Sequence, residues 1–146
     1  MTARVFVDTN VLVYARDRTD EDKHRQALAW MAVLWEERAG HLSWQVLQEY
    51  YVTVTRKLDP PRDSSLARED VTSLVTWRPI PTDLATIDAA WAVEDRFGLS
   101  WRDSLIVAAA QVGGCSHLLS EDLQDGQLLD GVTVIDPFRH TPESIL

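Results

Sequence analysis

The chain opens with a short apolar run that ends at a carboxylate. Residues 4–12 read Arg-Val-Phe-Val-Asp-Thr-Asn-Val-Leu, so a β-branched segment stops at Asp8 and a second apolar segment follows at once. A short apolar run that stops at a turn signal is typical of a buried strand in a parallel sheet. Ligands of open α/β sheets bind at the carboxyl ends of the strands. The pattern therefore predicts Asp8 at the rim of a functional crevice, although helix capping alone also explains a carboxylate there.

The length of 146 residues suits one domain with a core, so we expect a single domain over residues 1–146. The formal net charge of −9 argues against a generally basic, nucleic-acid-coating surface. It leaves open an enzyme whose carboxylates hold cations that in turn meet phosphates. Cys115 is the only cysteine, and we expect it to be buried rather than nucleophilic. With no apolar run long enough to span a bilayer, we expect a cytoplasmic protein that does not contact a membrane.

Short apolar segments alternate with helix-like segments along the chain. The expected strands are 4–8, 41–43, 77–80, 117–120 and 132–135. The expected helices are about 10–16, 21–39, 44–58, a segment that starts at 64 or 65, 83–97 and 100–112. This alternation indicates the α/β class, with a central, mostly parallel sheet of about five short strands flanked by helices. We expect the first strand to be the central one.

Four acidic residues lie where this topology brings the ends of elements together. Asp8 and Asp122 follow the first and fourth strands, and right-handed crossovers place the carboxyl ends of those strands on one edge. Asp103 lies in the first turn of a helix that leads into the fourth strand, so it is expected at the same edge. Glu49 lies one turn into the helix that follows the second strand. Each acid alone has an ordinary explanation, because acids also cap helices, form turns and pair with bases at the surface.

Together these carboxylates repel one another unless cations or protons neutralise them. The hard ions Mg²⁺ and Mn²⁺ suit an all-oxygen site, and they can activate a water for hydrolysis of a phosphodiester. The chain has no HExxH motif, no Cys/His metal pattern and no Walker-type or GxGxxG loop. Thr9 and Asn10 remain to cap the first helix. Because neutralising one acid relieves repulsion, we expect an Asp8→Asn variant to fold and to be more stable than the wild type.

Four motifs, in order along the chain, resemble those of a known family. They are Val7-Asp8-Thr9-Asn10-Val11-Leu12, Gln48-Glu49-Tyr50-Tyr51 with Thr55-Arg56-Lys57-Leu58, Trp101-Arg102-Asp103-Ser104-Leu105-Ile106, and residues 119–126. The chain is similar to PIN domains, and more closely to the VapC-type toxin ribonucleases of type II toxin–antitoxin systems. The resemblance covers nearly the whole chain. It implies a Mg²⁺- or Mn²⁺-dependent endoribonuclease, usually neutralised by a cognate antitoxin that is encoded beside it.

The resemblance also implies roles for individual residues. Asp8 and Asp103 correspond to the principal metal ligands, and Glu49 and Asp122 to the remaining acids of a catalytic quartet. The residues expected to support the quartet are Asn10, Ser120 and Asp125. The residues expected to contact RNA are Arg56, Lys57 and Arg102.

Alternatives of other classes remain open. A catalytically inactive PIN-type RNA-binding module would carry the same motifs without turnover. A receiver-like signalling domain also gathers acids at a sheet edge, but it needs a lysine after its last strand, and the only lysines are Lys23 and Lys57. A haloacid-dehalogenase-like phosphatase needs a second acid two residues after the first, where this chain has Asn10.

The expected partners are an RNA substrate, the cognate antitoxin and a second copy of the chain, in a homodimer or a toxin–antitoxin hetero-oligomer. The chain contains six tryptophans, a residue type that is favoured as an anchor at protein interfaces. We expect the helix over 21–39, with Trp30 and Trp35, to contribute to the groove that receives the antitoxin.

Overall fold

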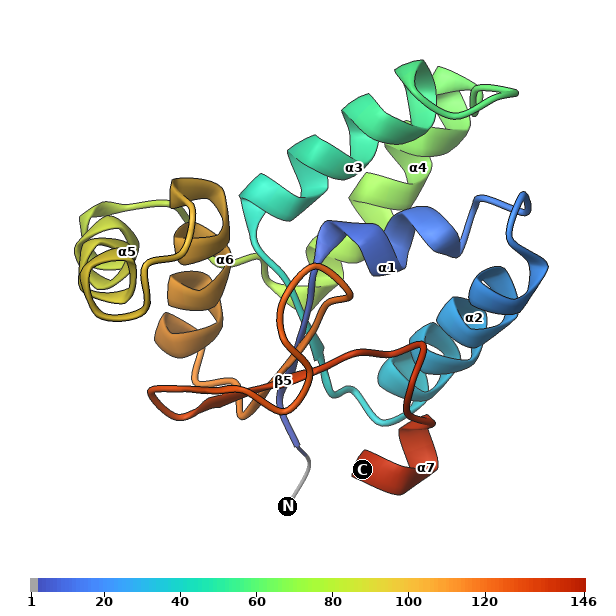
Figure 1. The fold of residues 1–146 in the computed structure, drawn as a ribbon. Coiled ribbons are helices and arrows are strands. Elements are labelled where there is room, and N and C mark those ends of the chain that lie inside the picture. The colour runs from blue at the N-terminus through green and yellow to red at the C-terminus, as the bar shows by residue number, and fades with distance from the viewer. Residues whose placement is uncertain (1–2) are drawn as a thin grey trace.

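The strands of the computed structural model form one five-stranded sheet within the described residues, 3–146 (Figure 1). The strands are β1 (Val5–Val7), β2 (Gly40–His41), β3 (His117–Leu119), β4 (Leu128–Leu129) and β5 (Val132–Ile135). Their order across the sheet is β2-β1-β3-β5-β4. All neighbouring pairs are parallel except β4 with β5. The expected α/β class with a mostly parallel sheet is therefore confirmed.

Helices lie on both sides of these strands (Figure 1). They are α1 (Thr9–Tyr14), α2 (Glu21–Glu36), α3 (Trp44–Arg56), α4 (Ser64–Leu74), the 3₁₀ helix η1 (Val75–Trp77), α5 (Leu84–Phe97), α6 (Trp101–Val112) and α7 (Pro142–Ile145). Helix α5 packs against α6, and α3 packs against both α1 and α4. Within residues 3–146, no helix is long and apolar enough to cross a membrane.

Local capping explains why several helices begin where the sequence predicts. The hydroxyl of Ser43 accepts a hydrogen bond from the amide of Val46 at the start of α3, and Ser100 does the same for Asp103 at the start of α6. At the end of α5, Gly98 adopts a φ of 66°, a left-handed conformation that glycine takes without a Cβ clash. Cys115 is buried as expected, and burial raises the pKa of its thiol to about 12.

The expected strand over 77–80 is wrong. Residues up to Trp77 form the 3₁₀ helix η1, Arg78 turns the chain with a φ of 55°, and only Ile80 makes an isolated parallel bridge, to Ser43. Pro79 follows directly and has no amide hydrogen to donate to a ladder. The segment instead packs the indole of Trp77 against the main chain of β2.

The fifth strand of the sheet is β4, which the sequence reading missed. It pairs antiparallel with β5 through the two-residue turn Asp130-Gly131, whose φ angles are 48° and 92°. An Asp-Gly dipeptide is favoured in type I′ hairpins because both central residues need positive φ. The expectation that β1 is the central strand is also wrong: β3 lies in the middle of the sheet, and β1 is its neighbour.

Candidate active site

The carboxyl ends of β1 and β3 form the floor of the candidate active site. Asp8 follows β1 and Ser120 follows β3, and both side chains are fully buried. The parallel register pairs Val7 with Leu119, so the two side chains emerge beside each other. Ser120 Oγ donates a hydrogen bond of 2.8 Å to Asp8 Oδ2. The sheet register therefore fixes the position of the buried carboxylate.

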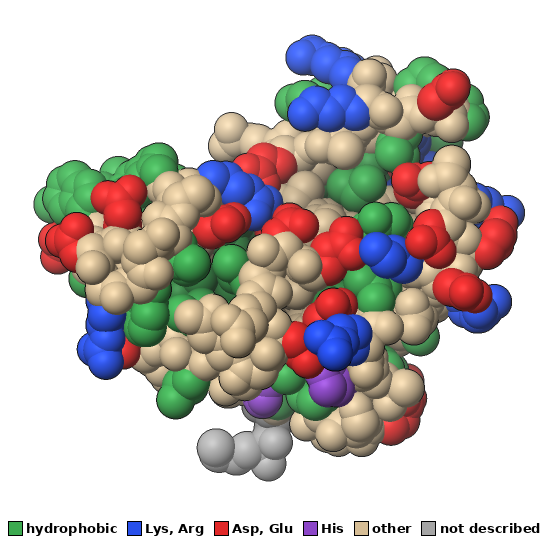
Figure 2. All heavy atoms as spheres, viewed as in Figure 1, with side chains coloured by type: hydrophobic (Ala, Val, Ile, Leu, Met, Phe, Trp, Pro, Cys, Tyr) green, Lys and Arg blue, Asp and Glu red, His purple; other side chains and the backbone are tan. Residues whose placement is uncertain are grey.

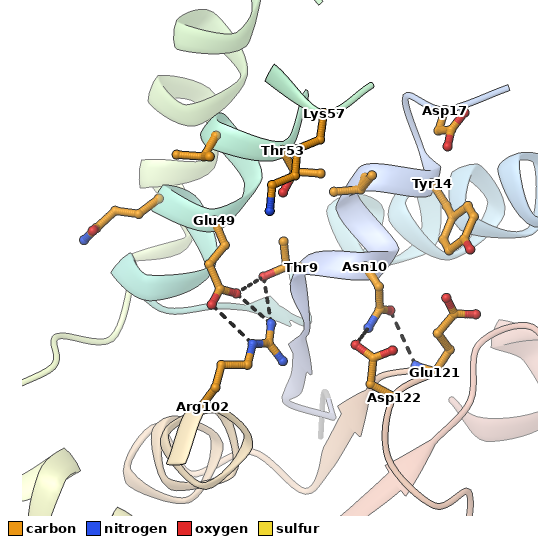
Figure 3. Close-up of a pocket in the computed structure, with 13 residues that line it drawn as sticks. Thr9, Asn10, Tyr14, Asp17, Glu49, Thr53, Lys57, Arg102, Glu121 and Asp122 are labelled. Carbon is orange, nitrogen blue, oxygen red and sulfur yellow. Dashed lines mark hydrogen bonds and ion pairs between the residues drawn. The ribbon is translucent and has the colours of Figure 1, made fainter. Parts of the chain in front are cut away.

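Asp8 also caps α1. Its Oδ1 accepts a hydrogen bond of 2.7 Å from the main-chain amide of Thr9, so the expectation that Thr9 and Asn10 do the capping is wrong. Their side chains instead reach two other acids (Figure 3). Thr9 Oγ1 donates to Glu49 Oε1 at 2.7 Å, and Asn10 Nδ2 donates to Asp122 Oδ2 at 3.1 Å. The first turn of α1 thus connects Glu49 on α3 and Asp122 in the loop after β3 to Asp8 at the end of β1.

The guanidinium of Arg102, in the first turn of α6, lies between three carboxylates. Its Nη2 is 2.8 Å from Asp8 Oδ1 and 2.6 Å from Glu49 Oε1, and its Nη1 is 3.1 Å from Asp103 Oδ1. Figure 3 shows the arginine reaching up from α6 toward Glu49 on α3. The pKa of the guanidinium is raised: partial burial opposes the rise, but the hydrogen bonds that it donates to Glu49 and Asp8 outweigh this effect. Arg102 therefore stays charged and acts as the common counter-ion of these acids.

Glu49 is stabilised in its ionised form. Partial burial raises its pKa, but hydrogen bonds from Arg102 and Thr9 more than offset this effect, so the pKa lies below the ordinary value. On its own helix, Arg56 and Thr53 would be ordinary surface partners for Glu49, but the hydrogen bonds that the structure describes for Glu49 come from Thr9, Gln45 and Arg102.

The pKa of Asp122 is shifted in the opposite direction from that of Glu49. Loss of water around the carboxyl group raises its pKa, as does the charge of Asp8, and the hydrogen bond from Asn10 offsets only part of the rise. Its amide donates to Ser120 Oγ at 3.1 Å, so Ser120 contacts both Asp8 and Asp122. The neighbouring Glu121 is paired with Lys23 at 2.7 Å and is already neutralised.

A hollow of about 670 Å³ extends from these acids between α1 and α3. Figure 2 shows acidic side chains gathered across the middle of this face. The residues that line the hollow are Thr9, Asn10, Val13, Tyr14, Asp17, Gln48, Glu49, Val52, Thr53, Lys57, Arg102, Glu121 and Asp122. Lys57 is thus the basic group at the α3 side of the hollow, whereas the exposed Arg56 is not part of its lining.

Asp125 does not join the acidic group. Its Oδ1 accepts a hydrogen bond of 2.9 Å from the amide of Asp136, and its Oδ2 is 2.8 Å from His140 Nε2. Asp125 therefore connects the loop after β3 to the segment after β5. From the sequence, Arg102 is expected only as a contact for RNA and not as a partner of the acids; its position beside Asp103 is the one signal for the second role.

The oxygen-rich donor set fits a hard divalent cation. The carboxylates of Asp8, Glu49 and Asp103 all contact the guanidinium of Arg102. Asp122 is connected to Asp8 through Asn10 Nδ2, which lies 3.1 Å from Asp122 Oδ2 and 3.4 Å from Asp8 Oδ2. Within residues 3–146, no three His, Cys, Asp or Glu side chains are spaced to hold a metal ion as they stand. The chemistry of the donors therefore suits a hard divalent cation, and in this structure Arg102 lies between three of the carboxylates.

A parallel sheet with convergent acids at its carboxyl edge defines an α/β protein with a candidate hydrolytic site. The family model described as the PIN domain matches residues 5–124, and the chain belongs to this family. The PIN domain is a nuclease-type fold, which supports hydrolysis as the kind of reaction. A search of curated proteins found no match to this chain.

Proposed function

We propose that this PIN domain is a divalent-metal-dependent endoribonuclease and the toxin component of a type II toxin–antitoxin pair. One observation carries the proposal: carboxylates from three separate segments, Asp8, Glu49 and Asp103, meet one cationic group at the carboxyl edge of the sheet. Mutual repulsion opposes such a gathering, so its presence supports a site that serves to hold positive charge.

Asp8 and Asp103 would hold the Mg²⁺ or Mn²⁺ ion. A bound divalent ion supplies a Lewis acid that polarises a phosphoryl oxygen and lowers the pKa of a nearby water. The protein contributes a fixed orientation of the ligands, because Ser120 Oγ and the amide of Thr9 hold the two oxygens of Asp8. Glu49 would add a third negative charge to the site, and the hydrogen bond from Thr9 Oγ1 holds its carboxylate in place.

Asp122 would accept a proton during hydrolysis. Its pKa is raised toward the range in which a carboxylate accepts protons more readily, and Asn10 holds its Oδ2 at 3.1 Å. The amide of Glu121, 3.4 Å from Asn10 Oδ1, fixes the amide plane of that asparagine. Asn10 therefore orients the acid, and Asp122 supplies the proton-accepting oxygen.

RNA would lie along the hollow between α1 and α3. Glu49 and Asp122 line one part of the hollow and Lys57 another, so a strand whose phosphate meets Lys57 would pass these two acids. This arrangement also explains how a protein of net charge −9 would bind a polyanion: local basic groups and a bound cation replace a basic surface.

The leading rival is a catalytically inactive RNA-binding PIN module. Incubation of the purified protein with 5′-labelled RNA distinguishes the two: we expect cleavage with Mg²⁺ or Mn²⁺, no cleavage in chelator, and a loss of at least about a hundredfold for Asp103→Asn. An exposed aspartate on α5 supplies the matched control, Asp88→Asn. Full cleavage in chelator would contradict the metal dependence, and RNA binding without cleavage at any metal concentration would favour the rival.

We also propose where the antitoxin binds. A second hollow, of about 400 Å³, lies between α1, α2 and α4, and its lining includes Leu28, Met31 and Trp35. Leu28 and Trp35 are 45% and 42% exposed, so apolar surface is available for an amphipathic segment. Trp30, by contrast, is 1% exposed and belongs to the core, so it is wrong as an anchor for a partner.

Copurification with the product of the neighbouring gene tests this surface. We expect Trp35→Ala to weaken the complex, while Trp91→Ala, at an exposed tryptophan of α5, leaves it intact. Equal retention of the partner by both variants would place the antitoxin elsewhere.

A further inference from the structure

The hydrogen bonds of Asp8 leave little room for another ligand. Its Oδ1 accepts from the amide of Thr9 and from Arg102 Nη2, at 2.7 and 2.8 Å. Its Oδ2 accepts from Ser120 Oγ at 2.8 Å and has longer contacts with Arg102 Nη1 at 3.3 Å and Asn10 Nδ2 at 3.4 Å. A carboxylate offers about four lone-pair positions, and five donor contacts already surround this one. A metal ion can bind Asp8 only if at least two of these five contacts are lost, and Arg102 makes two of them.

Arg102 is the donor that can leave most readily. The amide of Thr9 is main chain at the start of α1, and Ser120 is fully buried. The side chain of Arg102 is 35% exposed, and it is the one charged donor among these contacts. A guanidinium and a divalent cation on the same oxygens would also repel each other. Displacement of Arg102 therefore removes both the steric and the electrostatic obstacle.

The other two acids depend on the same guanidinium. Arg102 Nη2 and Nε contact the two oxygens of Glu49 at 2.6 and 3.2 Å, and Nη1 contacts Asp103 Oδ1 at 3.1 Å. The arginine thus uses all three of its nitrogens within the acidic group. It also lines the 670 Å³ hollow, so the displaced side chain has open space beside the site.

We propose that Arg102 is an internal counter-ion that competes with the divalent cation for Asp8, Glu49 and Asp103. Without metal, the guanidinium offsets part of the charge of these acids and stabilises the folded chain. Metal binding requires the guanidinium to leave them, so Arg102 sets the metal concentration at which the site fills. The inference rests on the proposed metal-dependent function and adds a device that regulates it.

Mn²⁺ binding to the full chain tests the competition. The free-ion signal in electron paramagnetic resonance gives the dissociation constant for the wild type and for Arg102→Met, which keeps a long apolar side chain and removes every donor. The matched control is Arg56→Met, which removes the same charge from an exposed position at the end of α3. We expect Arg102→Met to bind Mn²⁺ at least about tenfold more tightly than the wild type, a difference of about 1.4 kcal/mol, and Arg56→Met to stay within about twofold.

Thermal unfolding supplies a readout that does not depend on activity. In chelator, we expect Arg102→Met to melt below the wild type because its acids lack their counter-ion, and Mn²⁺ to raise its melting temperature more than that of the wild type. Arg102→Lys serves as the second variant if Arg102→Met does not fold. Its single ammonium cannot span three carboxylates, so we expect Mn²⁺ affinity above that of the wild type.

The possible outcomes separate this inference from the proposed function. If the wild type binds Mn²⁺ and the Arg102 variants bind it equally or more weakly, the competition is overturned while the metal site stands. If neither the wild type nor any variant binds Mn²⁺, both the metal dependence and the competition are overturned. Tight binding by the variants with weak or undetectable binding by the wild type supports both.

Discussion

Arg102 Nη2 lies 2.8 Å from Asp8 Oδ1, in an ion pair whose carboxylate is fully buried. This pair changes what neutralisation of Asp8 is expected to do. If the site held only acids, loss of one negative charge would relieve repulsion and raise the free energy of unfolding. With a guanidinium among the acids, each carboxylate also stabilises the arginine, and a buried pair that loses one partner leaves an uncompensated charge.

Asp8→Asn is therefore expected to lower the free energy of unfolding in chelator by about 1–3 kcal/mol, the reverse of the expectation from the sequence. Asparagine keeps the capping oxygen for the amide of Thr9, so α1 should remain and the variant should fold. Urea unfolding followed by circular dichroism measures the difference. Asp88→Asn, at an exposed site on α5, should change stability by less than about 0.5 kcal/mol. An Asp8→Asn variant more stable than the wild type would show that repulsion among the acids outweighs the pair with Arg102.

Lys57→Met is expected to weaken RNA binding without loss of the fold. Lys57 is exposed and lines the hollow that contains the acids, so we assign it to a phosphate of the substrate. Binding of single-stranded RNA in chelator should show a slope against the logarithm of salt concentration that is about 0.7 shallower than in the wild type. The control Arg96→Met removes a charge from α5, where the Arg96 side chain is 68% exposed and pairs with Asp130. A slope for Lys57→Met equal to that of the wild type would show that Lys57 does not contact a phosphate of the RNA. An equally large change for Arg96→Met would show the same.

Trp30→Ala is expected to test the fold rather than a partner. The indole is 1% exposed, and its Nε1 donates to the carbonyl oxygens of Pro137 and His140 at 2.9 and 3.1 Å. Truncation should lower the free energy of unfolding by about 3–5 kcal/mol, measured by denaturant titration. Trp35→Ala should cost less, because Trp35 is 42% exposed, although its ring also contacts that of Trp77. Similar losses for the two variants would contradict this division.

Asp125 is expected to contribute stability that depends on pH. The hydrogen bonds from the Asp136 amide and from His140 hold the pKa of Asp125 below its ordinary value of 3.8. A lowered pKa in the folded state gives stability that is present above the ordinary value and is lost as the pH falls through the folded value. Asp125→Asn should therefore be less stable than the wild type at pH 6, and the difference should narrow below about pH 4. Unfolding titrations at both pH values measure it, and a difference that widens at low pH would contradict the assignment.

The helices and the acidic edge could be predicted because they depend on local signals. Ser43 and Ser100 cap α3 and α6 near the residues where the sequence predicts these helices to begin, and Gly98 follows α5 where its predicted helix ends. The alternation of short strands with helices implied a parallel sheet, and handed crossovers then brought segments far apart in sequence to one edge. The proximity of Asp8 to Glu49 and Asp103 followed from that topology.

The errors lie where pairing between segments outweighs local propensity. The apolar residues near Trp77 resemble a strand, but Pro79 lacks a donor, and the neighbouring strand packs beneath the indole at Gly40. A Cβ at Gly40 would lie 2.4 Å from the ring of Trp77, so this contact depends on glycine. The Asp130-Gly131 dipeptide is a hairpin signal in the sequence. The strand before it, β4, has only two residues and is therefore too short to show a strand pattern of its own.

By itself, the sequence determined which acids end which elements, because strand periods and helix caps are encoded in neighbouring residues. Only the tertiary structure decided what neutralises those acids. Arg102 is adjacent to Asp103 in the chain, and nothing in that spacing says whether its long side chain points to solvent or to Asp8, 94 positions away. The packing of α6 against β3 and β5 makes that choice, because it brings the guanidinium in the first turn of α6 within reach of the buried carboxylate that follows β1.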